Sequence, residues 1–288
     1  MTPTTAPTPT VSPALPVASV GPVLIALDID GTLTEPASVT VPEPTTAAVK
    51  GVCAAGHHVV LASGRSLAGV LPIADALDLD GWVIASNGAV IARRWRPAGH
   101  AFEISDVRPL NARQVVDAAL SVGVPGLIIA AEEVGHGYYV SAEFPAGELR
   151  GGQAVIPVHE LGAIATPRIV LRAPDVLELV EPLRALGLTV TPGATAELVD
   201  VTPPAVSKAS ALETVRRRLR VERMDTVAVG DGVNDLEALA WARYGVAMGH
   251  APAEVREAAD LVTGTLGEHG AVAVLDVLAT LSAGVRRR

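Results

Sequence analysis

Asp28-Ile29-Asp30-Gly31-Thr32 directly follows the apolar run Val23-Leu24-Ile25-Ala26-Leu27, which has the length and branching of a buried parallel strand. In open α/β sheets, ligands bind beyond the carboxyl ends of such strands. Positions i and i+2 of a strand share a face, so Asp28 and Asp30 would point the same way, although Gly31 indicates that the chain is turning. Two acids this close repel unless a cation or a proton lies between them. The pentapeptide therefore predicts a chemical site, with a helix N-cap and a spare acid as the alternative.

The composition restricts the class of protein. With 288 residues, the chain is long enough for two domains or for one domain with a large insertion. Apolar residues make up 49% and aromatic residues 3%, so the core must be built from Ala, Val and Leu, which suits an α/β fold. The net charge of −9 argues against a nucleic-acid partner and is compatible with a divalent cation and a small anionic substrate.

The cysteine content and the N-terminal segment indicate a cytoplasmic protein. Cys53 is the single cysteine, which excludes an internal disulfide and fits a reducing compartment. We expect it to be buried and inert on a helix face. No apolar stretch reaches membrane-spanning length, so no membrane partner is predicted. Residues 1–20 are uncharged, rich in Pro and Thr, and lack the basic start of a signal peptide, which predicts a disordered tail.

Strand and helix patterns alternate at both ends of the chain. The first region predicts strands at 23–27, 59–62 and 81–85 and helices at 45–55 and 67–77. The alternation resumes with a helix at 209–219, a strand at 226–229, a helix at 236–242 and a strand at 245–248. Each of the first three strands ends in small polar residues or Gly, as loops around a polar site tend to do.

The middle of the chain has a different pattern. Short alternating segments at 138–143, 168–172, 188–191 and 197–202 are separated by Gly/Pro turns and by helical stretches at 112–122 and 175–186. This spacing predicts a largely antiparallel sheet with helices on one side. We therefore divide the chain into a tail (1–20), a core split in sequence (21–88 and 204–288) and an inserted α+β cap (89–203).

Four predicted element ends carry candidate chemistry: the Asp28/Asp30 turn, Ser63, Lys208 and the run from Gly230 to Asp235. Ser63 alone could belong to an ordinary turn, and Lys208 could be an exposed lysine at a helix start. However, Lys208 is one of only two lysines in the chain, and a compact point charge suits a phosphate site. The run Gly230-Asp231-Gly232-Val233-Asn234-Asp235 holds two acids and an amide between a strand and a helix, which indicates a metal and anion site.

In order and spacing, these segments resemble the haloacid dehalogenase-like superfamily and, within it, the Cof-type branch of capped sugar-phosphate phosphatases. The resemblance implies a Rossmann-like three-layer α/β core with a parallel sheet, interrupted by the inserted cap. It covers nearly everything from Val23 to the C-terminal helix. It rests on Asp28–Thr34, Leu61–Arg65, Ser86–Ala89, Val206–Lys208, Gly230–Glu237, Val246–Gly249 and Ala259–Thr263.

The resemblance also implies roles for the site residues. Asp28 would be the nucleophile that forms an aspartyl-phosphate, and Asp30 would protonate the leaving alcohol and then activate water. Mg²⁺ would be held by Asp28, the backbone carbonyl of Asp30, and Asp231, with Asp235 as a further or outer ligand. The substrate phosphate would be held by Ser63, Lys208, Asn234 and backbone N–H groups near Asp30 and Gly64.

These roles predict a Mg²⁺-dependent phosphatase acting on a small phosphorylated metabolite, most simply a sugar phosphate. A phosphomutase or phosphotransferase of the same superfamily remains an alternative, and so does a non-enzymatic phospho-acceptor or sugar-phosphate sensor. In the cap, Glu132 and Glu133 are candidate acceptors for sugar hydroxyls. Tyr138 and Tyr139 would face opposite sides of a strand, so that one could meet substrate. The segment 93–96 (Arg-Arg-Trp-Arg) fits a solvated hairpin better than a second phosphate site, and the histidines lack metal-ligand spacing.

Overall fold

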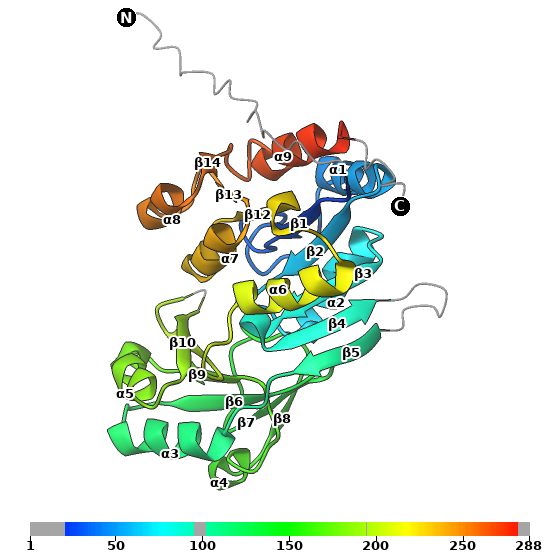
Figure 1. The fold of residues 1–288 in the computed structure, drawn as a ribbon. Helices are drawn as coiled ribbons and strands as arrows, with labels where there is room; N and C mark the ends of the chain where they lie inside the picture. The colour runs from blue at the N-terminus through cyan, green and yellow to red at the C-terminus, as the bar shows by residue number, and fades with distance from the viewer. Residues whose placement is uncertain (1–20, 95–101, 194, 282–288) are drawn as a thin grey trace, which may run out of the picture.

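The computed structural model describes residues 21–94, 102–193 and 195–281. The predicted tail and the Trp95-Arg96 part of the proposed hairpin lie outside these ranges. The described chain forms two β-sheets, the larger one drawn above the smaller one in Figure 1. The two sheets are linked by hydrogen bonds between residues far apart in sequence, such as Ser86 and Glu132.

The larger sheet has eight strands, and its first six in spatial order are parallel. The last two add to it in antiparallel fashion. Strand β1, which precedes the acidic turn, lies near the middle, between β12 and β2. The spatial order is β14 (Leu261–Val262), β13 (Tyr244–Ala247), β12 (Thr226–Gly230), β1 (Leu24–Leu27), β2 (His58–Ala62), β3 (Gly81–Ala85), β4 (Val90–Arg94) and β5 (Phe102–Val107).

Helices cover both faces of the larger sheet and bury its alternating apolar residues. Ile25 and Leu27 of β1 pack toward one helix layer, whereas Leu24 and Ala26 pack toward the other. Each fully buried Leu or Ile contributes about 1.5–3 kcal/mol through the apolar surface removed from water. The first layer is α1 (Glu43–Ala54), α2 (Leu67–Ala76) and α9 (Gly270–Ala279), and the second is α6 (Lys208–Leu219), α7 (Leu236–Trp241) and α8 (Ala253–Ala258). The predicted three-layer α/β core is confirmed.

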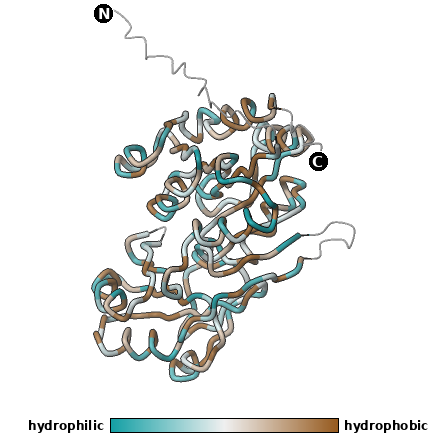
Figure 2. The backbone as a smooth tube through the Cα atoms, in the orientation of Figure 1, coloured by the Kyte–Doolittle hydropathy of each residue, from teal (hydrophilic) through white to brown (hydrophobic). Residues whose placement is uncertain are grey.

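The smaller sheet has six strands and is antiparallel except where β7 pairs with β8. Its helices pack on one face, as the sequence pattern predicts, and Figure 2 shows the hydrophobic stretches of its strands. The strands, in spatial order, are β10 (Thr189–Pro192), β11 (Leu198–Thr202), β9 (Ile169–Arg172), β6 (Ile128–Glu133), β7 (Gly137–Val140) and β8 (Gly152–Val155). The helices are α3 (Ala112–Val122), α4 (Val158–Leu161) and α5 (Val180–Ala185), which follows the 3₁₀ turn η3 (Val176–Leu179).

Strands β4 and β5 extend the larger sheet, although both lie within residues 89–203, which the sequence assigns to the cap. Ile84 of β3 pairs with Ile91 of β4, and Arg93 of β4 pairs with Glu103 of β5. The second sheet begins only with β6. The largely alternating pattern of β5 fits an antiparallel strand in either sheet, so the sequence does not show which sheet β4 and β5 join. The division of the chain at residue 88 stays a prediction.

Two expectations about single residues are wrong. Cys53 is exposed, because Val52 faces the core and the next helical position is turned about 100° away. Arg94, expected in a solvated hairpin, is buried, where it donates a hydrogen bond to the Leu79 carbonyl and pairs with Asp75. Across the described part of the chain, every helix is too short or too polar to cross a bilayer.

Candidate active site

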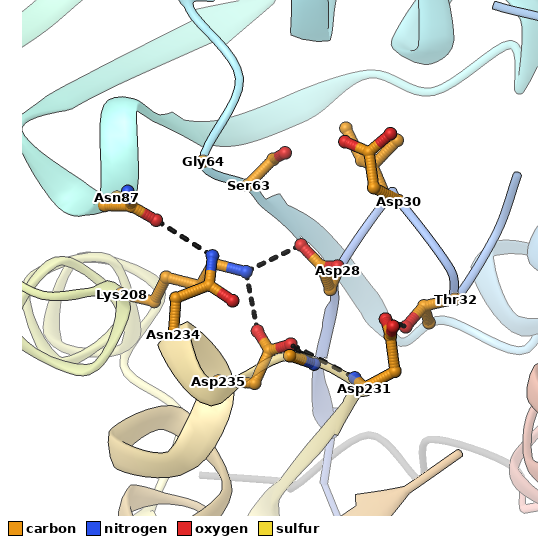
Figure 3. Close-up of polar contacts among 12 residues, drawn as sticks. Asp28, Asp30, Thr32, Ser63, Gly64, Asn87, Lys208, Asp231, Asn234 and Asp235 are labelled. Atoms are coloured by element: carbon orange, nitrogen blue, oxygen red, sulfur yellow. Dashed lines mark hydrogen bonds and ion pairs between the residues drawn. The ribbon is translucent and has the colours of Figure 1, made fainter. Parts of the chain in front are cut away.

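The parallel strands deliver polar side chains to one edge of the larger sheet. The backbone N–H of Asp28 donates to Val229 O at 3.0 Å, and that of Ser63 donates to Ile84 O at 3.0 Å, so the ladder continues one residue beyond each strand. Figure 3 shows the resulting cluster, which contains Asp28, Ser63, Lys208, Asp231, Asn234 and Asp235. The structure therefore brings these predicted site residues together from four separate segments of the chain.

Lys208 lies at the centre of this cluster and is 1% exposed. It is the first residue of α6, whose N-terminus is closed by reciprocal hydrogen bonds between Ser207 and Ser210. Its Nζ donates to Asp28 Oδ1 and to Asp235 Oδ1, each at 2.6 Å. Burial alone would lower the pKa of Lys208, but Asp235 and Asp28 outweigh it and hold the pKa above its ordinary value. The lysine is therefore a fixed positive charge.

Three acids share a small volume beside this lysine. Ligand oxygens of Asp28, Asp231 and Asp235 lie within 4.8 Å of one another. Burial, followed by repulsion from Asp235, raises the pKa of Asp28 well above its ordinary value, and burial also raises the pKa of Asp231. Carboxylate oxygens are the ligands of hard divalent cations, and a cation between the acids would offset this repulsion. The donor set fits such an ion.

The turn after β1 packs directly against Asp231. Thr32 Oγ1 donates to Asp231 Oδ1 at 3.0 Å. Gly31 has a φ of +78°, and a Cβ at this position would lie 2.2 Å from Asp231 Oδ2. Only glycine combines this backbone conformation with so close an approach. On the other side, Asp235 Oδ2 accepts from the backbone N–H groups of Asp231 and Gly232, at 3.1 and 2.9 Å.

Asp30 binds different partners from Asp28. Its two carboxylate oxygens accept hydrogen bonds from Arg65 Nε and Nη2 at 2.8 and 2.7 Å, and Oδ1 also accepts from Ala37 N at 2.7 Å. Figure 3 shows the carboxylate turned away from Lys208. Burial would raise the pKa of Asp30, but the bonds and charge of Arg65 hold it below its ordinary value. Arg65 belongs to the Ser-Gly-Arg motif, yet the sequence alone assigns it no role.

The loop after β2 is tightly folded and packs against two asparagines. Ser63 Oγ accepts from the backbone N–H of Arg65 at 3.1 Å. Gly64 packs so closely on Asn87 and Asn234 that a Cβ would lie 3.1 Å from Asn87 Oδ1. Asn234 Nδ2 donates to Asn87 Oδ1 at 3.0 Å, which places the predicted phosphate residue Asn234 against the loop.

The inner face of the smaller sheet carries a buried polar group that we call the cap cluster: Glu132, Tyr138, Arg168 and Asp200. Arg168 Nε donates to Glu132 Oε2 at 3.0 Å, and Nη2 donates to the Tyr138 hydroxyl at 2.5 Å. Arg168 Nη1 also pairs with Asp200 Oδ2 at 3.4 Å. Burial raises the pKa of Tyr138 to about 12 and also raises that of Asp200. The cluster is nearly closed to water and rich in charge.

The cap cluster contacts the loop after β3. Ser86 Oγ donates to Glu132 Oε2 at 2.6 Å, and Asn87 Nδ2 donates to Asp200 Oδ2 at 3.3 Å. Ser86, Asn87 and Gly88 all have positive φ values, a conformation that costs non-glycine residues of order 1–3 kcal/mol each. Such strain is retained where the surroundings fix the backbone, and here the N–H groups of Ser86 and Asn87 donate to the carbonyls of Arg65 and Ser63 at 2.7 and 3.1 Å.

The remaining cap and histidine predictions have mixed outcomes. Tyr138 and Tyr139 do face opposite sides of β7: Tyr138 lies in the inner cluster, and Tyr139 packs toward the helices. Glu133 is exposed, whereas Glu132 is completely buried and already paired. His250, to which the sequence assigns no role, lies with Nε2 3.6 Å from Asp231 Oδ2. No signal in the sequence indicates this contact, because the histidines lack metal-ligand spacing.

The comparison with protein families decides the identity of this fold and site. The family of haloacid dehalogenase-like hydrolases matches residues 25–121 and 175–275. The chain belongs to this family. A phosphoglycolate phosphatase of Natronomonas pharaonis is 31% identical over 256 residues, which cover 88% of this chain and 96% of the relative.

Solved structures of the same superfamily have the same fold. A phosphatase from Bacteroides thetaiotaomicron superposes with a TM-score of 0.75 at 27% identity, covering 94% of this chain and 100% of that chain. A sugar phosphatase of subclass IIB has a TM-score of 0.74 at 22% identity, covering 90% and 100%, and this likeness concerns the fold alone. The predicted membership of the Cof-type branch is confirmed, and the chain is a phosphoric monoester hydrolase of the haloacid dehalogenase-like type.

Proposed function

We propose that this phosphatase hydrolyses small phosphorylated metabolites, and sugar phosphates in particular, with Mg²⁺ and through an aspartyl-phosphate on Asp28. The observation that carries the proposal is the arrangement around Asp28: a buried carboxylate bound by Lys208 and within 4.8 Å of the ligand oxygens of Asp231 and Asp235. Phosphoryl transfer needs in-line positioning and neutralisation of oxygen charge more than other chemistry. Both needs are met by a fixed lysine beside a cation-binding acid cluster.

The proposed reaction has two steps. In the first, a carboxylate oxygen of Asp28 attacks phosphorus, the bond from phosphorus to the leaving oxygen breaks, and Asp30 gives that oxygen a proton. In the second, Asp30 takes a proton from water, the water oxygen attacks phosphorus, and the bond to Asp28 breaks. The products are the alcohol and inorganic phosphate, and both aspartates return to their starting states.

The surrounding residues would hold the transferring group. Lys208 would balance the charge on the phosphoryl oxygens while it fixes Asp28. Ser63 would donate its hydroxyl proton to one of these oxygens, because its lone pair already accepts from the Arg65 N–H. Mg²⁺, held by Asp28, Asp231 and the Asp30 carbonyl with Asp235 behind them, would supply Lewis-acid stabilisation of phosphoryl oxygen charge.

The cap cluster supports a neutral, hydroxyl-bearing leaving group. Its acceptor groups are two carboxylates and a phenol, and groups of this kind pair well with hydroxyls. Arg168 is the cation of this cluster, and four acceptors already engage it: Glu132, Tyr138, Asp200 and the Gly64 carbonyl. A second anionic group on the substrate would therefore compete with these bonds. This supports a sugar phosphate over a phosphorylated acid such as phosphoglycolate, the substrate in the name of one relative.

The test is a kinetic comparison on the purified full chain. With Mg²⁺, 4-nitrophenyl phosphate should be hydrolysed, and Asp28→Asn should abolish this. Chelation of divalent metal should also stop turnover, and added Ca²⁺ should inhibit because its larger, looser shell spoils the in-line geometry. Full activity after exhaustive chelation would exclude the metal assignment.

A substrate panel then tests the class of metabolite. The kcat/KM values should be higher for hexose and pentose phosphates than for phosphoglycolate. The reverse order would overturn the proposed sugar preference but leave the phosphatase mechanism intact. A strict requirement for a sugar bisphosphate activator would instead identify a phosphomutase.

A further inference from the structure

Arg168 connects the smaller sheet directly to the loop after β2 of the larger one. It precedes β9, and its side chain is 5% exposed. Its Nη1 donates to the carbonyl oxygen of Gly64 at 2.5 Å, a contact between residues 104 positions apart in the chain. This bond reaches the backbone of the Ser63-Gly64-Arg65 motif from the opposite domain.

The peptide unit that Arg168 binds also contacts Ser63. The Gly64 carbonyl and the Arg65 N–H belong to one planar trans peptide, so they point in opposite directions. The carbonyl accepts from Arg168, and the N–H donates to Ser63 Oγ at 3.1 Å. A hydrogen bond to the carbonyl polarises the peptide and strengthens the bond that its N–H makes. Arg168 is thus two hydrogen bonds from the Ser63 hydroxyl.

We propose that Arg168 is a positioning residue for phosphoryl transfer: it fixes the Gly64–Arg65 peptide from the cap and thereby orients the Ser63 hydroxyl toward the transferring phosphoryl oxygen. This inference rests on the proposed function, in which Ser63 holds that oxygen.

The cap cluster holds Arg168 rigidly enough for this task. Burial alone would lower its pKa, but Tyr138, Asp200 and Glu132 outweigh that effect and keep it above its ordinary value. The guanidinium is therefore charged, and it uses Nε, Nη1 and Nη2 on different partners. A lysine cannot reproduce this pattern, because its single ammonium group lacks the planar fork of donors.

A second link from the cap reaches the same loop. Asp200 accepts from Asn87, whose side-chain oxygen accepts from Asn234. Gly64 packs against both asparagines. The Gly64 loop is therefore held on one side by Arg168 and on the other by a chain that ends at Asp200. Both links come from the cap, so docking of the cap and correct placement of Ser63 occur together.

Arg172 provides a matched control. It lies four residues after Arg168, on the same face of the strand. It also pairs with two acids, Glu148 at 2.9 Å and Glu197 at 2.7 Å. These partners belong to the cap alone. Arg172→Lys therefore disturbs a comparable ion-pair group without touching the Gly64 loop.

The experiment is a double-mutant cycle on the full chain with Mg²⁺. Wild type, Arg168→Lys, Ser63→Ala and the double variant are assayed with 4-nitrophenyl phosphate, with Arg172→Lys beside them. Removal of a donor that stabilises transition-state charge costs about 10²–10³ in kcat, so Ser63→Ala should fall in that range. Arg168→Lys, which leaves Ser63 in place but less well oriented, should lower kcat on the order of tenfold.

Non-additivity distinguishes positioning from a structural role. If Arg168 acts through Ser63, Arg168→Lys should change kcat less than about twofold in the Ser63→Ala background. Arg172→Lys should keep the wild-type kcat. Independent, multiplying losses in the double variant would overturn the proposal, and so would an equal loss in Arg172→Lys.

Two additions make the outcome decisive. If Arg168→Lys fails to fold, as judged by circular dichroism, Glu132→Gln replaces it, because this change loosens the Nε partner of Arg168 but keeps the arginine. If the wild type hydrolyses no phosphate ester, the proposed function is wrong. In that case, the affinity of the same four proteins for orthophosphate is measured by calorimetry. The inference is supported if Arg168→Lys weakens binding several-fold only when Ser63 is present. Equal weakening in both backgrounds overturns it.

Discussion

The guanidinium of Arg65 holds both carboxylate oxygens of Asp30, at 2.8 and 2.7 Å. Asp30 is consequently an anion in this structure, because these bonds lower its pKa against the opposing effect of burial. A general acid must carry a proton when the leaving oxygen departs. The proposed mechanism therefore requires Asp30 to release Arg65 and to bind the leaving group instead. The strength of the Arg65 hydrogen bonds sets the free energy of that change of partner.

Arg65→Gln should move the pH profile of the enzyme. The hydrogen bonds and the charge of Arg65 hold the pKa of Asp30 below its ordinary value, so the substitution should raise that pKa. With an alkyl phosphate, which needs a protonated acid, kcat/KM falls as pH rises through this pKa. The falling limb should therefore shift to higher pH. Arg94→Gln, which removes a buried arginine far from the site, is the control and should leave the falling limb of the pH profile in place. An unshifted falling limb in Arg65→Gln would contradict the role given to Arg65.

Asp30→Asn separates the two chemical steps. The amide keeps the shape but moves no proton, and general acid–base groups typically contribute about 10²–10⁴-fold, so turnover should fall by that order. With 4-nitrophenyl phosphate the first step needs little acid assistance, whereas the second still needs a base. A phosphorylated Asp28 should accumulate and appear in mass spectrometry as a hydroxylamine-sensitive adduct. Turnover at the wild-type rate, or a stable phosphoryl group on the wild type itself, would be incompatible with the mechanism.

Gly31→Ala should weaken metal binding as well as stability. The φ of +78° costs an alanine about 1–2 kcal/mol, and the added Cβ would lie 2.2 Å from Asp231 Oδ2, so that Asp231 must move. Mg²⁺ affinity measured by calorimetry should fall at least about tenfold, within the range for disturbed metal-site support. Gly123→Ala is the control, because its φ is +79° and nothing lies within 4 Å of its Cβ position. It should lose similar stability and bind Mg²⁺ normally.

Tyr138 should make stability depend on alkaline pH. Burial raises its pKa to about 12, above the unfolded value of about 10. The folded state therefore holds a proton that the unfolded state loses between pH 10 and 12, so this contribution is full below pH 10 and disappears as pH rises to 12. Over this window the free energy of unfolding should fall by about 2–3 kcal/mol more in wild type than in Tyr138→Phe. Parallel denaturant titrations at the two pH values measure the difference, and equal losses would refute it.

The core and its acid cluster could be predicted because local sequence determines both. An apolar run such as Leu24–Leu27 has one stable environment, and the polar residues after each run must then meet at one edge of the sheet. The sequence singles out Lys208 as one of only two lysines, whereas its pairing with Asp28, 180 positions away, is seen only in the structure.

The contacts between the two sheets could not be predicted in the same way. Arg168 and Gly64 meet only because the cap docks on the core, and no local pattern encodes that docking. The same limit applies to Glu132. The sequence shows an acid at this position, but it does not show that Ser86 and Arg168 donate hydrogen bonds to its carboxylate. The partner of Asp30 was equally hidden, since Arg65 reads in sequence as part of a turn.

The position of β1 between β2 and β12 has a consequence for synthesis on the ribosome. Strand β1 emerges early and pairs with β2, but its other edge stays open until Thr226–Gly230 leaves the exit tunnel. All strands of the smaller sheet are translated between β2 and β12. The smaller sheet can therefore fold while the larger sheet is still incomplete. An open edge of this kind attracts other strands. Nascent chains stalled before β12 should therefore be the species that chaperones bind and that aggregates most readily.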